Sequence, residues 1–334
     1  MKIINIPIEP LEERYSIQWD KWFKEQFAEN KLNVQTVYGT KTKGKIIHGS
    51  FLDVLETNLY KTSQLQKIIK ILHEYDNKEP LVLFFHDLWF PGLANIAYIR
   101  DGMHLKNLYI CGCLHAGSYD PYDFLNKQQM TPWAHLLEES MFEIVDMIFV
   151  ATYFHAEMLH KRRKVPNSII HVTGFPLYPD FVQQTTKEGI ILFPHRLDSE
   201  KQPDLFDALK QMSFPYSLHW TWIKTKDVAK TKEEYYTLLN KSRFAISFAL
   251  QETWGIAMQE AVLCGCFPIV PRRLSYPELY IDPFLYDSVG EILSMIDKFW
   301  NDPPLEELRL QQKSILNNGA KAIPHIINLI KTLQ

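Results

Sequence analysis

Short apolar runs alternate with longer amphipathic stretches along the whole chain. Runs such as residues 80–85 and 108–114 are apolar at nearly every position, as in strands of a parallel sheet that is covered on both faces. Stretches such as residues 16–28 and 63–75 instead carry large apolar side chains three or four positions apart, which predicts amphipathic helices. Because parallel strands need a crossover between them, this alternation predicts an α/β fold.

The same pattern predicts further elements in both halves of the chain. We expect the other strands at residues 2–7, 34–37, 147–150, 169–172, 190–193, 217–223, 244–248 and 267–270. We expect the other helices at residues 133–142, 154–160, 203–212, 233–240 and 255–264, and helical patterns also close the chain.

A segment rich in helix and strand breakers divides this pattern into two halves. Gly174, Pro176 and Pro179 are followed by a polar stretch that runs to Gly189. A chain of 334 residues is also long enough for two domains. We therefore expect two Rossmann-like, doubly wound domains that face each other across a cleft, with ligands at the carboxyl ends of the strands. The expected bounds are residues 1–175 for the first domain, 176–188 for a linker, 189–310 for the second domain and 311–334 for a C-terminal helix.

Composition and charge narrow the class of protein. Hydrophobic residues make up 46% of the chain and charged residues 22%, which excludes general disorder. A formal net charge of −3 argues against a nucleic-acid binder that is basic overall, although a local basic patch remains compatible with it. No apolar run reaches the roughly 18 residues that span a bilayer, and residues 1–7 look like a strand rather than a signal peptide. We therefore expect a cytoplasmic protein, or one of the host cytoplasm if the source is viral.

The four cysteines form two pairs, each separated by one glycine within an apolar run: Cys111 with Cys113, and Cys264 with Cys266. Zinc-binding thiolates are usually two to four residues apart, so we favour buried small side chains over a metal site. A cytosolic chain of this size does not need disulfides.

The strongest chemical signal is a pair of glutamates that follows the strand expected at residues 244–248. Seven residues separate Glu252, in the loop after the strand, from Glu260, which falls about two turns into the next helix. Gly255 between them lets the backbone approach a ligand, and the start of the helix offers free amides to an anion. The alternative is an ordinary surface helix with two acidic residues.

A second signal lies in residues 193–203, which also follow a strand and precede a helix. Arg196 and Lys201 flank a tight loop there, and two cations in such a loop could hold a diphosphate. The alternative is a capped helix start, with Asp198 or Ser199 as the cap and solvated charges around it.

Together these two segments resemble the donor-binding domain of retaining glycosyltransferases with the GT-B fold, of the kind grouped as glycosyltransferase family 4. That family has an arginine and a lysine after the first strand of its C-terminal domain, and a glutamate pair with the same spacing as here. It then has a glycine, a proline and an apolar strand, which residues 264–270 match. The resemblance covers about residues 188–280 and implies the GT-B architecture for the whole chain.

Within that family, the chain is most similar to the branch of tRNA-queuosine mannosyltransferases. The similarity lies in residues 260–262, 264–266 and 276–278. Residues 6–10 and 13–15 also resemble uncharacterised phage glycosyltransferases. The resemblance further implies that the last helix crosses back to the first domain, as in many GT-B proteins.

The resemblance implies a role for each matching residue. Glu260 would accept hydrogen bonds from ribose hydroxyls of a UDP- or GDP-sugar, and Glu252 would hold hydroxyls of the donor sugar. Arg196 and Lys201 would neutralise the diphosphate as it leaves, because fixed cations stabilise the charge that develops there. Backbone amides at the start of the helix would assist, namely those of Trp254, Gly255 and Ile256.

Two further features bear on the chemistry. The chain has no Asp-x-Asp motif, which metal-dependent glycosyltransferases normally need, so we expect no catalytic metal. Trp254 stands where the family more often has phenylalanine, which leaves the identity of the donor open. A glycosidase would need two carboxylates that face one bond, and nothing in the sequence selects such a pair over Glu252 and Glu260.

The first half carries fewer matching residues. The family often has a glycine pair after its first strand; here the loop has none, and we expect Arg14 to substitute in a phosphate contact. His86 and His115 each follow a buried strand, and His115 is the better match to a family histidine that contacts the sugar. The alternative for both is a structural histidine. Asp87 and Asp120 are further candidates for acceptor contact or a general base, although a retaining GT-B enzyme usually lacks an obvious protein base.

Basic and aromatic residues in the first half bear on the acceptor. Residues 41–45 and 161–164 are basic clusters that could follow a phosphate backbone. Several aromatic side chains could stack on an extruded base: Tyr119, Tyr122, Phe124 and Trp133. The alternatives are solvated loops with core aromatics, and an anionic membrane surface.

The sequence thus predicts a retaining glycosyltransferase that moves a sugar from a nucleotide sugar to a hydroxyl. The favoured acceptor is a modified base in nucleic acid, either hydroxymethylpyrimidine in phage DNA or queuosine in tRNA. The alternatives are a small-molecule, lipid or polysaccharide acceptor and, in a different class, a non-catalytic module that binds nucleotide sugars.

Overall fold

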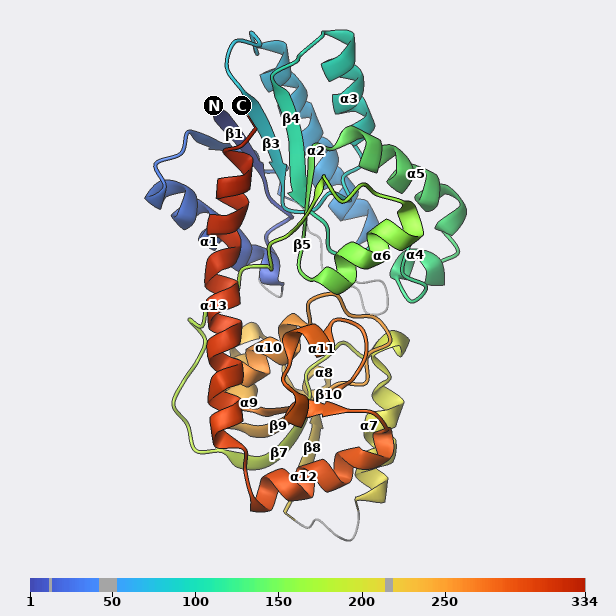
Figure 1. Ribbon diagram of the computed structural model, residues 1–334, viewed down its shortest axis with the longest axis vertical. Helices are drawn as coiled ribbons and strands as arrows, with labels where there is room; N and C mark the ends of the chain where they lie inside the picture. The colour runs from blue at the N-terminus through green and yellow to red at the C-terminus, as the bar shows by residue number, and fades with distance from the viewer. Residues whose placement is uncertain (12–13, 42–52, 214–218, 334) are drawn as a thin grey trace. The chain divides into compact units, whose positions relative to one another are not determined.

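The chain folds into two compact units, each with its own sheet (Figure 1). The computed structural model describes the chain except residues 12–13, 42–52, 214–218 and 334. The first unit comprises Met1–Pro176 together with Lys321–Gln334, and the second comprises Leu177–Ala320.

The first unit is a six-stranded sheet in the order β2-β1-β3-β4-β5-β6, and every described pair is parallel. The strands are β1 (Lys2–Ile6), β2 (Val34–Thr36), β3 (Leu81–Phe85), β4 (Leu108–Cys113), β5 (Met147–Val150) and β6 (Ile170–Val172). The helices are α1 (Tyr15–Glu29), α2 (Val54–His73), α3 (Leu93–Gly102), α4 (Phe124–Lys127), α5 (Thr131–Ile144) and α6 (Tyr153–Arg163).

Strand order decides where ligands can reach this sheet. From β1 the chain moves outward to β2, and from β3 it moves the other way through β4 to β6. Right-handed crossovers therefore put α1 and α3 on opposite faces, with the topological switch point between β1 and β3. Beside that point, β3 is buried along its whole length, as the apolar run at residues 80–85 predicted, and β1 is buried at every position after Lys2.

The second unit repeats this plan with five parallel strands in the order β11-β10-β9-β7-β8. The strands are β7 (Glu188–Phe193), β8 (Thr221–Lys224), β9 (Ser242–Ile246), β10 (Phe267–Pro271) and β11 (Leu285–Tyr286). The helices are α7 (Pro203–Met212), α8 (Thr225–Val228), α9 (Lys232–Lys241), α10 (Ile256–Leu263), α11 (Tyr276–Leu279), α12 (Ile292–Asn301) and α13 (Leu305–Ile330), with 3₁₀ turns η1 (Ser199–Lys201), η2 (Asp282–Phe284) and η3 (Val289–Glu291). Its switch point lies between β7 and β9, the two strands that precede the chemical signals in the sequence.

The prediction of two doubly wound α/β domains is confirmed, but individual elements differ from the expectations. Helix α3 follows Pro91 and Gly92 and was not predicted. Helix α2 begins at Val54 rather than at residue 63, and the Asp53 side chain caps it by accepting from the amides of Leu55 and Glu56. The division between the units falls inside α13, whose residues from Lys321 onward belong to the first unit.

All four cysteines are buried free thiols, as the apolar runs around them predicted. The Cys266 thiol donates to the carbonyls of Leu239 and Ser242 at 3.3 and 3.2 Å. No group of three or more His, Cys, Asp or Glu side chains that could hold a metal ion occurs among the described residues. None of the helices in the described part of the chain has the length and apolar character needed to cross a membrane.

Candidate functional site

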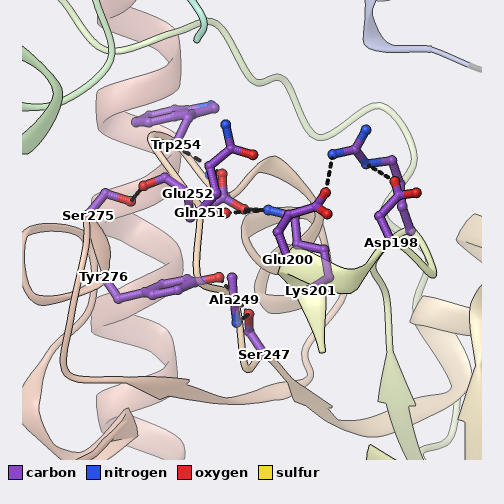
Figure 2. A network of polar contacts seen from close by, with 12 residues as sticks. Asp198, Glu200, Lys201, Ser247, Ala249, Gln251, Glu252, Trp254, Ser275 and Tyr276 are labelled. Atoms are coloured by element: carbon purple, nitrogen blue, oxygen red, sulfur yellow. Dashed lines mark hydrogen bonds and ion pairs between the residues drawn. The ribbon is translucent and has the colours of Figure 1, made fainter. Parts of the chain in front are cut away.

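Loops that leave the carboxyl ends of β7 and β9 bring two of the sequence signals together (Figure 2). The Lys201 ammonium, in the loop after β7, donates to the Gln251 carbonyl at 2.5 Å. It also lies 3.2 Å from Oε2 of Glu252, in the loop after β9. Two motifs about fifty residues apart in sequence therefore meet because their strands are neighbours at the switch point.

Three neighbouring groups stabilise the ionised form of Glu252: the Lys201 ammonium and two backbone amides. Its Oε1 accepts the Gly255 amide at 2.8 Å and the Trp254 amide at 3.4 Å. Burial by itself would raise the pKa of Glu252, but the Lys201 ammonium and the Gly255 amide outweigh it, so the pKa lies below its ordinary value. Two of the three amides expected to assist the donor thus donate to Glu252 in this structure, and Ile256 opens α10.

Gly255 makes this arrangement possible. It has φ +66° and ψ +43° at the N-terminal boundary of α10, a left-handed conformation that glycine adopts without steric cost. In this conformation its amide donates to the Glu252 carboxylate. The loop is tied further by Ser275, whose hydroxyl donates to the Glu252 carbonyl at 3.2 Å, and by Tyr276, whose hydroxyl lies 2.6 Å from that of Ser247.

The Arg196 guanidinium lies between two carboxylates of its own loop. Its Nε is 3.2 Å from Oδ2 of Asp198, and an Nη atom donates to Oε1 of Glu200 at 2.8 Å. The Arg196 side chain is 35% exposed, whereas that of Glu200 is only 3% exposed. Asp198, one of the two cap residues in the alternative of a capped helix start, makes no side-chain capping hydrogen bond to η1.

His195, directly before Arg196, is a residue to which the sequence assigned no role. It is 4% exposed, and its Nε2 has no hydrogen-bond partner among the described residues. Burial and the nearby Lys201 ammonium lower its pKa to about 3, so the imidazole is neutral. The available signal was its position, the second residue after β7.

Glu260 has a separate set of partners. It is 2% exposed on α10, and its three described side-chain partners all come from α9. Tyr236 donates to Oε1 at 2.8 Å, Tyr235 donates to Oε2 at 2.9 Å, and the Lys232 ammonium lies 3.3 Å from Oε1. The sequence predicted the glutamate but none of these three donors.

The candidates of the first unit gather at its own switch point. His86 Nε2 lies 2.8 Å from Oδ1 of Asn5, at the ends of β3 and β1. His115 donates from Nε2 to the His86 carbonyl at 2.8 Å, so its Nδ1 can accept from the Tyr15 hydroxyl at 3.3 Å. Burial lowers the pKa of His86 to about 3 and also lowers that of His115, so both rings are neutral. Arg14 is 7% exposed, and its guanidinium lies 5.7 Å from the Tyr15 ring centroid.

The other acceptor candidates have structural contacts. Asp87 pairs with Lys61 at 3.4 Å, and Asp120 accepts the Tyr122 amide at 2.9 Å within a turn. Of the basic cluster at residues 41–45, only Lys41 lies within the described residues.

The second basic cluster is only partly a surface feature. The Arg163 side chain is only 7% exposed: its Nε lies 3.0 Å from Oε2 of Glu138, and an Nη atom donates to the Ser118 hydroxyl at 2.8 Å. The expectation that all of residues 161–164 could follow a phosphate backbone is therefore wrong for Arg163. Lys161 is exposed and pairs with Glu157.

The aromatic candidates divide in the same way. Tyr119 is 2% exposed and its hydroxyl lies 2.7 Å from Nε2 of His155, which makes it a core residue rather than a stacking surface. Tyr122 and Trp133 are 43% and 51% exposed and remain available for stacking. Phe124 opens α4 and is half-buried.

Comparison with solved structures identifies the fold of the chain. The structure of sucrose-phosphate synthase from Thermosynechococcus elongatus matches with a TM-score of 0.67 over 100% of this chain and 99% of that one, at 13% identity. The chain has the GT-B glycosyltransferase fold. A second GT-B neighbour is the pneumococcal O-GlcNAc transferase in complex with UDP and GlcNAc, with a TM-score of 0.63 at 10% identity over 100% of this chain and 99% of that chain.

Sequence comparison gives a partial relative. The tRNA-queuosine alpha-mannosyltransferase of Drosophila melanogaster is 28% identical over 176 residues, which cover 44% of this chain and 47% of the relative. The chain thus matches about half the length of this curated relative. No family model matches the chain. The relative and the structural neighbours are glycosyltransferases.

Proposed function

We propose that this GT-B protein is a retaining glycosyltransferase that moves a sugar from a UDP- or GDP-sugar to an acceptor hydroxyl. The observation that carries the proposal is the contact of Lys201 with Glu252 beside Arg196, at the switch point between β7 and β9. Ligands of doubly wound sheets bind at such points. The pneumococcal neighbour, which binds UDP, supports a uridine nucleotide as one candidate donor.

The charges at this point suit the departure of a diphosphate. An ammonium has three N–H donors, and the described contacts of Lys201 use two of them, so one can reach a phosphate oxygen. Arg196 is held at the rim with its guanidinium partly exposed. The ionised Glu252 can accept hydrogen bonds from sugar hydroxyls. Fixed cations then stabilise the charge that develops on the leaving group.

The proposed acceptor is a modified base in nucleic acid. The partial relative that acts on tRNA-queuosine supports the tRNA version, and the exposed Tyr122 and Trp133 support stacking on a base. Hydroxymethylpyrimidine in DNA is the other version. The alternatives remain a small-molecule, lipid or polysaccharide acceptor and a non-catalytic nucleotide-sugar module. In this proposal His115 contacts the donor sugar and Arg14 contacts a phosphate of the donor.

A two-stage experiment tests the proposal. Thermal shift with UDP, GDP and their common sugar conjugates should raise the melting temperature of the protein for one nucleotide class, because ligands stabilise the folded state by mass action. That donor is then offered, with radiolabelled sugar, to tRNA, hydroxymethylated DNA and glycans. Transfer to nucleic acid that falls steeply with salt supports the nucleic-acid acceptor. No rise for any nucleotide contradicts the donor site, and tight donor binding without hydrolysis or transfer supports the non-catalytic module.

A further inference from the structure

The α9 side chains around Glu260 leave the carboxylate little freedom. A carboxylate offers about four acceptor positions, two on each oxygen. In the described part of the chain, Tyr236 and Lys232 take two positions on Oε1, and Tyr235 takes one on Oε2. These three donors leave one position, on Oε2, unused. A nucleotide ribose carries two neighbouring hydroxyls, so only one of them can donate to Glu260 without displacing a tyrosine.

The donors themselves are fixed in place. A capping box formed by Thr231 and Glu234 defines the start of α9, directly before Lys232. The Tyr236 ring stacks on Phe181 with centroids 4.4 Å apart and planes at 8°. The Lys232 ammonium lies 4.9 Å from the Tyr236 ring centroid. Burial raises the pKa of Tyr235 well above its ordinary value, so its hydroxyl remains a donor at neutral pH.

We propose that Lys232, Tyr235 and Tyr236 are positioning residues that orient Glu260 to accept a single ribose hydroxyl through Oε2. The inference rests on the proposed function, because it takes the ligand of this site to be a nucleotide. Its consequence is selective: removing one ribose hydroxyl weakens binding, whereas removing the other has much less effect. The α9 tyrosines then decide how strongly the site distinguishes the two.

Isothermal titration calorimetry with nucleotide analogues tests this inference. UDP and GDP are titrated first, and whichever binds is compared with its 2′-deoxy and 3′-deoxy forms. We expect the wild-type protein to bind one deoxy form roughly tenfold more weakly, the fold-change of one hydrogen bond to a charged group. The double variant Tyr235→Phe, Tyr236→Phe keeps both rings but loses both donors. It should bind the parent nucleotide roughly tenfold more weakly and lose most of the difference between the deoxy forms.

A matched control and a second variant separate positioning from stability. Tyr75→Phe, in the first unit, removes a hydroxyl that donates to the carbonyls of Glu79 and Asn107, and should leave every affinity unchanged. Lys232→Met changes a side chain that is 24% exposed and should also reduce the difference between the deoxy forms, even if the double variant does not fold. A loss of stability alone lowers the melting temperature but does not change the ratio of affinities.

Each remaining outcome decides between the two proposals. If the wild-type protein distinguishes the deoxy forms and the variants keep the same ratio, the positioning role is wrong and the donor site stands. If the wild-type protein binds the nucleotide but treats both deoxy forms like the parent, the single-hydroxyl contact is wrong. If neither UDP nor GDP binds, the proposed function fails and this inference fails with it.

Discussion

The Lys201 ammonium links the two halves of the candidate donor site. Its two described contacts reach the backbone and the side chain of the loop after β9, and its own side chain is 10% exposed. The Glu252 side chain is 15% exposed, and the ammonium and the carboxylate keep each other charged because each offsets the desolvation of the other. Removal of either partner therefore alters both ligand binding and protonation at this point.

Replacing Lys201 with methionine tests this link. Lys201→Met should weaken nucleotide binding at least roughly tenfold, because it removes the cation that our proposal places against the leaving diphosphate. Calorimetric dissociation constants for the nucleotide that binds are the measurement. Lys224→Met is the control, since Lys224 lies in the same unit and pairs with the partly exposed Asp207 at 2.7 Å. Equal affinities for the wild-type protein and Lys201→Met would contradict the donor site.

The depressed pKa of Glu252 predicts how stability depends on pH. A carboxyl whose folded pKa lies below its unfolded value contributes stability above the unfolded value, and loses it as pH falls through the folded pKa. The free energy of unfolding of Glu252→Gln should therefore be lower than that of the wild-type protein at pH 7. The difference should shrink between pH 5 and pH 3, as measured by urea unfolding. A difference that is constant across this range would show that folding does not lower the pKa of Glu252.

Candidate site residues could be predicted from the sequence where the strand, loop and helix around them are adjacent in the chain. Arg196, Lys201 and Glu252 stand in strand–loop–helix segments whose spacing indicates a site at a strand end. The donors to Glu260 come from a helix 24 to 28 positions earlier, and only the packing of α9 beside α10 brings them together. The sequence shows only the position of His195 after β7; its buried Nε2, which has no hydrogen-bond partner among the described residues, becomes visible in the structure alone.

Helix α6 shows how a buried ion pair can fix an element. Arg163, in its last turn, pairs with Glu138 of α5, and the Ser118 amide and hydroxyl donate to the same carboxylate at 2.5 and 2.7 Å. The Glu138 side chain is fully buried and that of Arg163 is 7% exposed. This contact joins α5, α6 and the loop after β4.

Breaking that pair should be costly. Arg163→Met leaves Glu138 buried without its counter-ion and should lower the free energy of unfolding by about 3 kcal/mol. Lys161→Met, on the same helix, removes an exposed pair with Glu157 and should cost about 1 kcal/mol or less. Urea unfolding followed by circular dichroism measures both. Similar small losses for the two variants would mean that the Arg163 pair does not hold these elements together.

Elements were predictable where the hydrophobic period is clear. The buried strands at residues 80–85 and 108–114 were located within about one residue of β3 and β4, because nearly every position in them is apolar. Helix α3 was missed because its buried positions, Leu93, Ile96 and Ala97, occupy a single short stripe after Pro91 and Gly92. A proline and a glycine in sequence fit both a continuing loop and the start of a helix. Only the packing of the residues that follow shows which of the two forms.

At the scale of the whole molecule, each unit has its own sheet and switch point. Hydrogen exchange can therefore locate the nucleotide site. Saturating nucleotide should slow exchange in the loops at residues 194–202 and 247–255 and in α9, because binding stabilises the backbone it contacts. Protection confined to the first unit would mean that the nucleotide binds there, and would contradict our proposal that it binds between β7 and β9 of the second unit.

The first unit is made of two segments of the chain, and the whole second unit lies between them in the sequence. Helix α13 contributes Ile323, Ile326, Ile327 and Ile330, all buried, to the unit that begins at Met1. A ribosome therefore releases every residue of the second unit before the first unit has its last helical turns. Although domains usually fold in the order of synthesis, here the first unit cannot complete its core until every residue of the second has been made.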